Sequence, residues 1–320
     1  MIGILGLGHI GEIHLKNWID LVGKDGILFY EPNIARSKEI ETKYAVSAVD
    51  SYDELIQCSD AIDIVTPTNT HFSLAKKALL SSKDIFVEKP ICETLEELHE
   101  LIAIQEKRKL IIQVGFVERY NPAYKAIFSK IQSPKFFEVH RLAPFTARGS
   151  EVSVIMDLMI HDIDIIVSFV DLPVASISAN GVAIMSKTPD IANARIEFEN
   201  GIVANLTASR ISMKKMRKMR IFSENMYSTI DFLEKKAELF EIKRQDSIEG
   251  IAFIDSQGEK KMLVNYIAPS SNENAMKIQL EDFKKNIACP IPNRKQQFKD
   301  YTRSLEIALS IQTIILSNSK

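Results

Sequence analysis

The chain has 320 residues, with 40 basic and 42 acidic side chains, a formal net charge of -2 and a sequence pI near 6.3. The chain therefore lacks the basic excess that is typical of proteins that bind nucleic acid or anionic membranes. Cys58, Cys92 and Cys289 lie far apart without CxxC spacing, which disfavours a disulfide framework and a zinc knuckle. No signal peptide or membrane span is recognisable, so we expect a cytoplasmic protein that binds neither membranes nor nucleic acid.

Residues 2–31 read as a strand, a glycine turn, a helix and a second strand that ends at Glu31. In a dinucleotide-binding unit, such glycines permit the turn, the approach of a pyrophosphate and close helix packing, while the helix N-terminus supplies N–H donors. A carboxylate at the position of Glu31 would accept hydrogen bonds from the adenosine ribose. A purely structural glycine turn is the alternative. The expected cofactor contacts are Gly6, Gly8, His9, Ile10, Gly11 and Glu31.

Strand-like and helical segments continue to alternate as far as residue 117. Thr94 and Glu97 form a capping box, which predicts a helix from there to Arg108. The alternation predicts an α/β fold with a doubly wound parallel sheet. We therefore expect a dinucleotide-binding Rossmann domain over residues 1–117 and a second domain over residues 118–320. The further strands are expected at 45–48, 61–65, 85–87 and 110–114.

The second half has a different pattern. One long apolar helix is expected over residues 154–170, followed by strand-like runs and by closing helices at 272–287 and 296–316. Apolar and polar residues alternate on both sides of Asn200-Gly201, which is typical of a two-residue hairpin turn. This pattern predicts an α+β domain with a largely antiparallel, open sheet.

Ligands of an open α/β sheet bind at the carboxyl ends of its strands. Besides the glycine turn, this rule selects two segments, Thr66 to His71 and Glu88-Lys89-Pro90. Pro90 favours an extended conformation at Lys89, whose amine could then donate to a substrate oxygen. A solvated surface lysine is the alternative, and His14 and His71 can equally be capping or packing residues.

Asp157, His161 and Asp164 are spaced i, i+4 and i+7 on the apolar helix. Burying such a polar stripe is costly unless its members bond to one another or to a ligand. A histidine is well suited to accept a proton at neutral pH, and a neighbouring carboxylate fixes its tautomer. These residues therefore indicate a proton-transfer site, with a buried polar network and a metal site as alternatives.

Taken in order, these motifs resemble those of the glucose-fructose oxidoreductase/inositol dehydrogenase (Gfo/Idh/MocA) family. The resemblance rests on the glycine turn with His14, Thr66-Pro67 with His71, Glu88-Lys89-Pro90, and Asp157 with His161. It implies an NAD(P)-binding first domain and a second domain that shapes the substrate site and often builds the oligomer. It also implies that Lys89 is the catalytic lysine, His161 the acid/base and Asp157 its polar partner. The cofactor would further be lined by Thr66, Pro67, Asn69, His71 and Glu88.

One segment departs from the family pattern. Ser153-Val154-Ile155-Met156 replaces the glycine-rich approach to the Asp and His, so the pocket wall is expected to differ. Residues 117–122 and 157–164 look most like the branch that acts on the 3-hydroxyl of UDP-N-acetylglucosamine-type sugars. On this interpretation the substrate would be bound by Arg119, Tyr120, Asn121, Arg148 and Arg210.

The expected reaction is reversible oxidation of a ring alcohol, with His161 taking the hydroxyl proton, Lys89 orienting the oxygen and hydride passing to the nicotinamide. Glu31 favours NAD because it would repel a 2′-phosphate, whereas Arg36 keeps NADP open. A homodimer or homotetramer is expected. The alternatives are a cofactor-binding sensor or scaffold without turnover, and an oxidoreductase of inositol or a free hexose with tightly bound cofactor.

Overall fold

The computed structural model describes residues 1–146, 152–244, 250–254, 258–268, 271–289 and 294–318. The chain divides into two compact units. The first comprises Met1–Val117 and Asn274–Thr302, and the second comprises Glu118–Glu273 and Arg303–Lys320. The segment Asn274–Thr302, which we expected in the second domain, thus belongs to the first unit.

The described part of the first unit contains a six-stranded parallel sheet in the order β3-β2-β1-β4-β5-β6. Every residue of the central strands β1 and β4 is buried, as expected where helices cover both faces of a parallel sheet. The predicted doubly wound fold is therefore confirmed. Its strands are β1 (Ile2–Leu5), β2 (Ile27–Tyr30), β3 (Ser47–Ala48), β4 (Ala61–Ile64), β5 (Asp84–Val87) and β6 (Ile112–Val114). Its connecting helices are α1 (His9–Val22), α2 (Ile34–Tyr44), α3 (Tyr52–Cys58), α4 (Thr68–Leu80) and α5 (Leu95–Arg108).

Local capping explains where several of these helices begin. The Asn33 side chain accepts from Arg36 N at the start of α2, and α5 has the predicted capping box of Thr94 and Glu97. Helix α4 begins at Thr68, so Asn69 and His71 lie in its first turns. The segment from Thr66 to His71 is therefore mostly helical.

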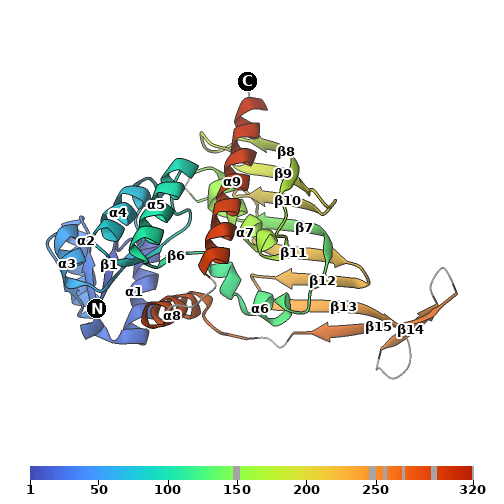
Figure 1. Ribbon diagram of the computed structural model, residues 1–320, viewed down its shortest axis with the longest axis horizontal. Coiled ribbons are helices and arrows are strands. Elements are labelled where there is room, and N and C mark those ends of the chain that lie inside the picture. The colour runs from blue at the N-terminus through green and yellow to red at the C-terminus, as the bar shows by residue number, and fades with distance from the viewer. Residues whose placement is uncertain (147–151, 245–249, 255–257, 269–270, 290–293, 319–320) are drawn as a thin grey trace. The chain divides into compact units, whose positions relative to one another are not determined.

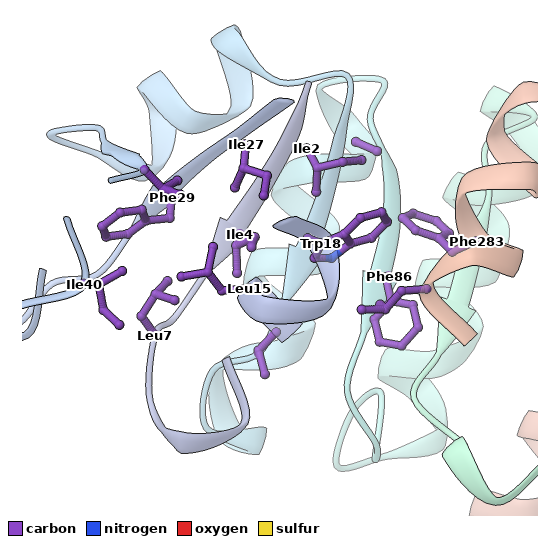
Figure 2. Close-up of a cluster of buried hydrophobic side chains, with 14 of the residues drawn as sticks. Ile2, Ile4, Leu7, Leu15, Trp18, Ile27, Phe29, Ile40, Phe86 and Phe283 are labelled. Carbon is purple, nitrogen blue, oxygen red and sulfur yellow. The ribbon is translucent and has the colours of Figure 1, made fainter. Parts of the chain in front are cut away.

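Helix α8 (Ala275–Ala288) completes the core of the first unit. Figure 2 shows Phe283 of this helix beside Trp18 and Phe86, and the ring centroids lie 6.4 Å and 5.8 Å from that of Phe283. The amides of Gln113 and Gln279 donate to backbone carbonyl groups of α8 and β6 respectively. These buried contacts between distant residues explain why α8 belongs to this unit.

The described part of the second unit contains a nine-stranded sheet in the order β14-β15-β13-β12-β11-β7-β10-β9-β8, which can be followed in Figure 1. Neighbours are antiparallel except β7 and β10, which confirms the predicted, largely antiparallel sheet. The sequence analysis did not identify β7, which pairs with both β10 and β11. The strands are β7 (Pro134–Leu142), β8 (Val174–Val182), β9 (Ile191–Phe198), β10 (Val203–Ser209), β11 (Met216–Ser223), β12 (Met226–Asp231), β13 (Lys236–Arg244), β14 (Ile251–Ile254) and β15 (Lys260–Ile267).

The expected hairpin joins β9 and β10. Gly201 has a φ of 81°, and its N–H donates to the carbonyl oxygen of Phe198 at 2.8 Å. The expected single helix over residues 154–170 is instead a π-helical turn, Ile155–Met159, followed by α7 (Ile160–Phe169). The other helical segments after β6 are a 3₁₀ turn (Val117–Tyr120), α6 (Pro122–Phe128) and α9 (Arg294–Asn318).

Candidate functional site

The three glycines of the turn after β1 differ in what surrounds them. Gly6 has a φ of 91°, and a Cβ on Gly11 would lie 2.0 Å from the carbonyl oxygen of Gly6, so the fold itself requires both residues. A Cβ on Gly8, in contrast, would meet no atom within 4 Å. The space above Gly8 is therefore left open by the protein and suits the close approach of a ligand.

The N-terminus of α1 follows at once. Gly8 is its N-cap and provides no side-chain hydrogen bond, and Gly8, His9 and Ile10 are exposed. The first N–H groups of a helix have no partner within it, and they attract anions together with the helix dipole. This end of α1, with the open space at Gly8, fits the pyrophosphate of a dinucleotide.

Glu31, at the end of β2, is already tied to the backbone. Its Oε2 accepts from Leu7 N at 2.7 Å and its Oε1 from Asn33 N at 3.0 Å. Each carboxylate oxygen has a second lone pair, so Glu31 can also accept from a ribose hydroxyl.

Arg36, five residues after Glu31 in the sequence, bonds to other groups. Its Nε donates to the carbonyl oxygen of Leu7 at 2.8 Å, and its other nitrogens pair with Glu12 and Glu39. Lys43, Tyr44 and Arg36 all donate to Glu12, and these bonds hold the pKa of Glu12 well below its usual range.

His71 joins two of the predicted ligand segments. Its Nε2 lies 2.8 Å from the carbonyl oxygen of Thr66, and its Nδ1 lies 2.7 Å from that of Pro90. The ring is buried and both nitrogens are directed to the backbone, while Pro67 and Asn69 are exposed beside Thr66. Cofactor contacts by these residues stay predictions, and the geometry gives His71 a role in holding the two segments together.

Glu88 and Lys89 follow β5, and Glu88 is closely surrounded. A Cβ on Gly115 would lie 2.6 Å from Oε1 of Glu88, so the carboxylate occupies the space that a glycine leaves. Its Oε2 accepts from the backbone N of Lys89 at 3.2 Å, and its Oε1 lies 3.2 Å from Nε2 of His14. The peptide bond between Lys89 and Pro90 is cis.

The segments Gly6–Gly11, Thr66–His71 and Glu88–Pro90 follow β1, β4 and β5, which are neighbours in the parallel sheet. Neighbouring parallel strands bring their carboxyl ends to one edge, so these segments share the edge at which such sheets bind ligands.

In the second unit, the predicted polar stripe is divided. Asp157 lies in the π-helical turn and His161 in the first turn of α7, and both are partly exposed. Asp164 is 1 % exposed and is bound by Arg119, with Nε to Oδ2 at 2.6 Å and Nη2 to Oδ1 at 2.8 Å. Asp164 therefore has a structural ion pair, while Asp157 and His161 remain accessible. Turns of π-helix are frequent at functional sites.

Asp162, the residue after His161, is held by a second buried arginine. The Nε of Arg141 donates to Oδ2 of Asp162 at 2.9 Å, and its Nη2 donates to Oδ1 at 2.7 Å. The remaining nitrogen, Nη1, donates to Oε1 of Glu118 at 2.9 Å. Burial lowers the pKa of Arg141, but the two carboxylates more than offset this effect and raise it above its usual value. The sequence analysis identified neither Arg141 nor Glu118.

The predicted substrate-binding residues have the following surroundings. Arg119 pairs with Asp164, and Asn121 caps α6 while its amide donates to Glu118 and to the carbonyl oxygen of Phe232. Arg210 is buried and donates to Asp190 at 2.8 Å. Arg148 lies outside the described residues, and Tyr120 ends the 3₁₀ turn. Each described arginine already binds a carboxylate of the fold. Substrate contacts by these residues stay predictions.

Within the described ranges, no group of three or more His, Cys, Asp or Glu side chains is arranged to hold a metal ion. None of the helices in this part of the chain combines the length and apolar character that a membrane crossing requires.

Two family descriptions match the chain. "Oxidoreductase family, NAD-binding Rossmann fold" matches residues 1–116, and "GFO/IDH/MocA C-terminal domain" matches residues 134–226. UDP-N-acetylglucosamine 3-dehydrogenase of Acidithiobacillus ferrooxidans is 31% identical over 91% of this chain and 89% of its own length. The scyllo-inositol 2-dehydrogenase (NAD(+)) of Bacillus subtilis is 30% identical over 65% of this chain and 67% of its own length.

Solved structures agree with these matches. A structure of the Acidithiobacillus ferrooxidans enzyme has a TM-score of 0.85 at 30% identity and covers 98% of this chain and 97% of that chain. Scyllo-inositol dehydrogenase from Lactobacillus casei, with NAD(H) and scyllo-inositol bound, has a TM-score of 0.75 at 19% identity, covering 99% and 97%, and shows the common fold. The chain therefore belongs to the Gfo/Idh/MocA family of oxidoreductases with an NAD-binding Rossmann fold.

Proposed function

We propose that this oxidoreductase uses NAD to oxidise the 3-hydroxyl of a UDP-N-acetyl-hexosamine. The observation that carries the proposal is the shared edge of β1, β4 and β5, at which the glycine turn, Thr66 and Lys89 follow their strands. A lysine at the ligand-binding edge of a dinucleotide fold is suited to a substrate oxygen, and a surface lysine elsewhere would have no such role.

The proposed roles of the catalytic residues are as follows. His161 takes the proton of the hydroxyl group, and Asp157 supports its imidazole. Lys89 donates a hydrogen bond to the same oxygen and orients it. The glycine turn and Glu31 would hold NAD, which would supply the hydride acceptor.

The contacts of Glu31 and Arg36 support NAD over NADP. Glu31 is fixed by two backbone N–H groups at the position of the ribose contact, where its charge would repel a 2′-phosphate. Arg36 would have to leave Glu12 and Glu39 to neutralise that phosphate. Replacing Glu31 by serine should therefore narrow the difference in affinity between NAD and NADP, as measured by calorimetry.

The choice of substrate rests on the similarity to the UDP-N-acetylglucosamine enzyme, which extends over 91% of the chain, against 65% for the scyllo-inositol enzyme of Bacillus subtilis. Membership of the family alone is compatible with inositols and free sugars as well. The substrate panel must therefore contain all three classes.

The test is a screen of the purified protein with NAD or NADP and with UDP-sugars, inositols or free hexoses. We expect reduced nicotinamide to form with a UDP-N-acetyl-hexosamine, and Lys89→Met and His161→Asn each to lower kcat by about 10²–10⁴-fold. Lys285→Met, a matched change at an exposed lysine, should leave kcat unchanged. Turnover of inositol alone would contradict the proposed substrate. NAD binding without any turnover would favour the alternative of a cofactor-binding sensor.

We also propose a homo-oligomer built on the sheet of the second unit. Four aromatic rings on neighbouring strands follow one another at centroid distances of 5.8, 5.0 and 6.1 Å, and Phe222 among them is 38% exposed. The other three rings are partly exposed, and apolar rows that reach the surface mark interaction surfaces. Light scattering should show a dimer or tetramer that Phe222→Glu dissociates, and a monomeric wild type would contradict the proposal. The rings belong to Phe136, Phe222, Tyr227 and Phe240.

A further inference from the structure

His14 is a buried histidine with no part in the proposed proton transfer. It lies on α1, is 0 % exposed, and its two ring nitrogens face two carboxylates. Nδ1 lies 2.9 Å from Oδ2 of Asp63 on β4, and Nε2 lies 3.2 Å from Oε1 of Glu88 after β5. The histidine thus joins the middle of the sheet to the residue that precedes Lys89.

The number of hydrogen bonds that the ring has to donate indicates its charge. A neutral imidazole has one N–H donor, whereas a doubly protonated ring has two. Carboxylates only accept, and the Asp63 oxygen that faces the ring already accepts from Nε1 of Trp18 at 2.7 Å. Only the imidazolium can donate to both Asp63 and Glu88.

The surroundings of the ring favour the same state. Burial lowers the pKa of His14, but the charges and hydrogen bonds of Asp63 and Glu88 more than offset it and raise the pKa to about 10. Among the described residues, the titratable groups that face the ring are these two carboxylates. The other contacts are aromatic, with Phe86 of β5 edge-on at 5.5 Å, and Phe283 of α8 packs behind Phe86 and Trp18.

A chain of hydrogen bonds continues from the ring to the proposed catalytic residue. One oxygen of Glu88 faces His14, and the other accepts from the backbone N of Lys89 at 3.2 Å. Gly115 leaves the space in which this carboxylate lies. The position of Glu88 therefore depends on His14 on one side, and the backbone of Lys89 depends on Glu88 on the other.

We propose that His14 is a positioning residue: as a buried imidazolium between Asp63 and Glu88, it fixes the Glu88 carboxylate and thereby the backbone at Lys89. This inference rests on the proposed function in so far as Lys89 acts on the substrate oxygen. With the proton in place the three side chains carry one net negative charge. Without it they would carry two in a buried site, and Glu88 would lose its donor.

The protonation state can be measured without substrate or cofactor. In ¹⁵N-histidine NMR of the wild type at about pH 8, where an ordinary histidine is neutral, both ring nitrogens of His14 should have imidazolium shifts. The His14→Gln variant assigns the signal, because only that signal should disappear. A neutral tautomer of His14 at this pH would overturn the proposal, since Glu88 would then have to donate its own proton.

The positioning role is tested by a double-mutant cycle on kcat. His14→Gln should lower kcat by about ten- to a hundredfold with little change in the Kd of NAD. Glu88→Gln should lower kcat to a similar extent, and the double variant should be no slower than the slower single variant. Independent roles would instead multiply the two losses, which would contradict the proposal. Phe283→Leu is the stability control, because Phe283 packs against Trp18 and Phe86. It should lower the Tm and leave kcat unchanged, and an equal loss of kcat in this variant would also overturn the proposal.

A failure of the proposed function would be recognised separately. If the wild type reduces no nicotinamide with any sugar, the dehydrogenase assignment fails, but the backbone amide resonance of Lys89 still reports on His14. That resonance should shift in His14→Gln and stay in place in Phe283→Leu. An unchanged Lys89 amide in His14→Gln would refute the positioning role by itself.

Discussion

The two units hold their proposed catalytic residues in a similar way but with different cations. In the first unit His14 lies between Asp63 and Glu88, and Glu88 precedes Lys89. In the second unit Arg141 lies between Glu118 and Asp162.

Asp162 directly follows His161, so each proposed catalytic residue is a sequence neighbour of a carboxylate that a buried cation holds. The cations differ because arginine stays protonated in proteins, whereas histidine can lose its proton. The second arrangement is thus permanent, and the first depends on pH.

The largest effect is expected from removing the permanent cation. Arg141→Met would leave Glu118 and Asp162 buried without their main partner, and breaking a buried ion pair from one side costs about 3–5 kcal/mol of stability. Urea unfolding followed by a probe in the second unit should show this loss. Arg195→Met, at an exposed pair with Glu197, should cost less than about 1 kcal/mol. Equal effects of both variants would contradict the account.

The next largest effect is the pH dependence of the first unit. The pKa of His14 rises from 6.5 to about 10 on folding, so its stabilisation is complete below pH 6.5 and is lost as the pH rises towards 10. The free energy of unfolding should therefore fall across this window, by on the order of a few kcal/mol. In His14→Gln this part of the slope should vanish. Parallel pH profiles for wild type and variant would show that the proton does not link Asp63 to Glu88.

A smaller effect is expected at Gly115. A Cβ there would lie 2.6 Å from Oε1 of Glu88, and extra volume in a packed site costs about 1–3 kcal/mol. Gly115→Ala should therefore lower the Tm and displace Glu88 from His14. Gly8→Ala is the matched control, because its Cβ would meet nothing within 4 Å. It should keep the Tm and weaken NAD binding, whereas a Tm loss equal to that of Gly115→Ala would contradict this distinction.

The smallest effect is expected from removing an exposed arginine that contacts the same carboxylate as the buried Arg141. Arg217 also contacts Oε1 of Glu118, at 3.3 Å, but its side chain is 46% exposed. Arg217→Met should change the free energy of unfolding by no more than about 1 kcal/mol. A loss as large as that of Arg141→Met would mean that burial does not decide the strength of these pairs.

Local patterns predicted the Rossmann sheet because its strands, glycine turn and capping box each depend on neighbouring residues. The hairpin at Asn200-Gly201 was predictable for the same reason. The place of α8 was not, because Phe283 and Gln279 meet their partners from far along the chain. The sequence also gave no local sign of the π-helical turn before α7.

The candidate site shows the same division. The segments at Gly6–Gly11, Thr66 and Lys89 follow from strand ends and are visible in sequence. The partners of His14 lie 49 and 74 residues away, so only the fold brings them together. Asp63, an acid inside the apolar run of β4, was the available signal for a buried polar contact. The ion pairs of Arg119 and Arg210 were not predictable either, because a sequence does not show which guanidinium a carboxylate of the fold holds.

Hydride transfer itself is tested most directly with a UDP-N-acetylglucosamine that carries deuterium at C3. Incubated with the wild type and NAD, this substrate should deliver deuterium to the nicotinamide ring, as detected by mass spectrometry of the reduced cofactor. Lys89→Met and His161→Asn should transfer little or none in the same time. Transfer that is undiminished in both variants, or reduced cofactor without deuterium, would contradict the proposed reaction at this site.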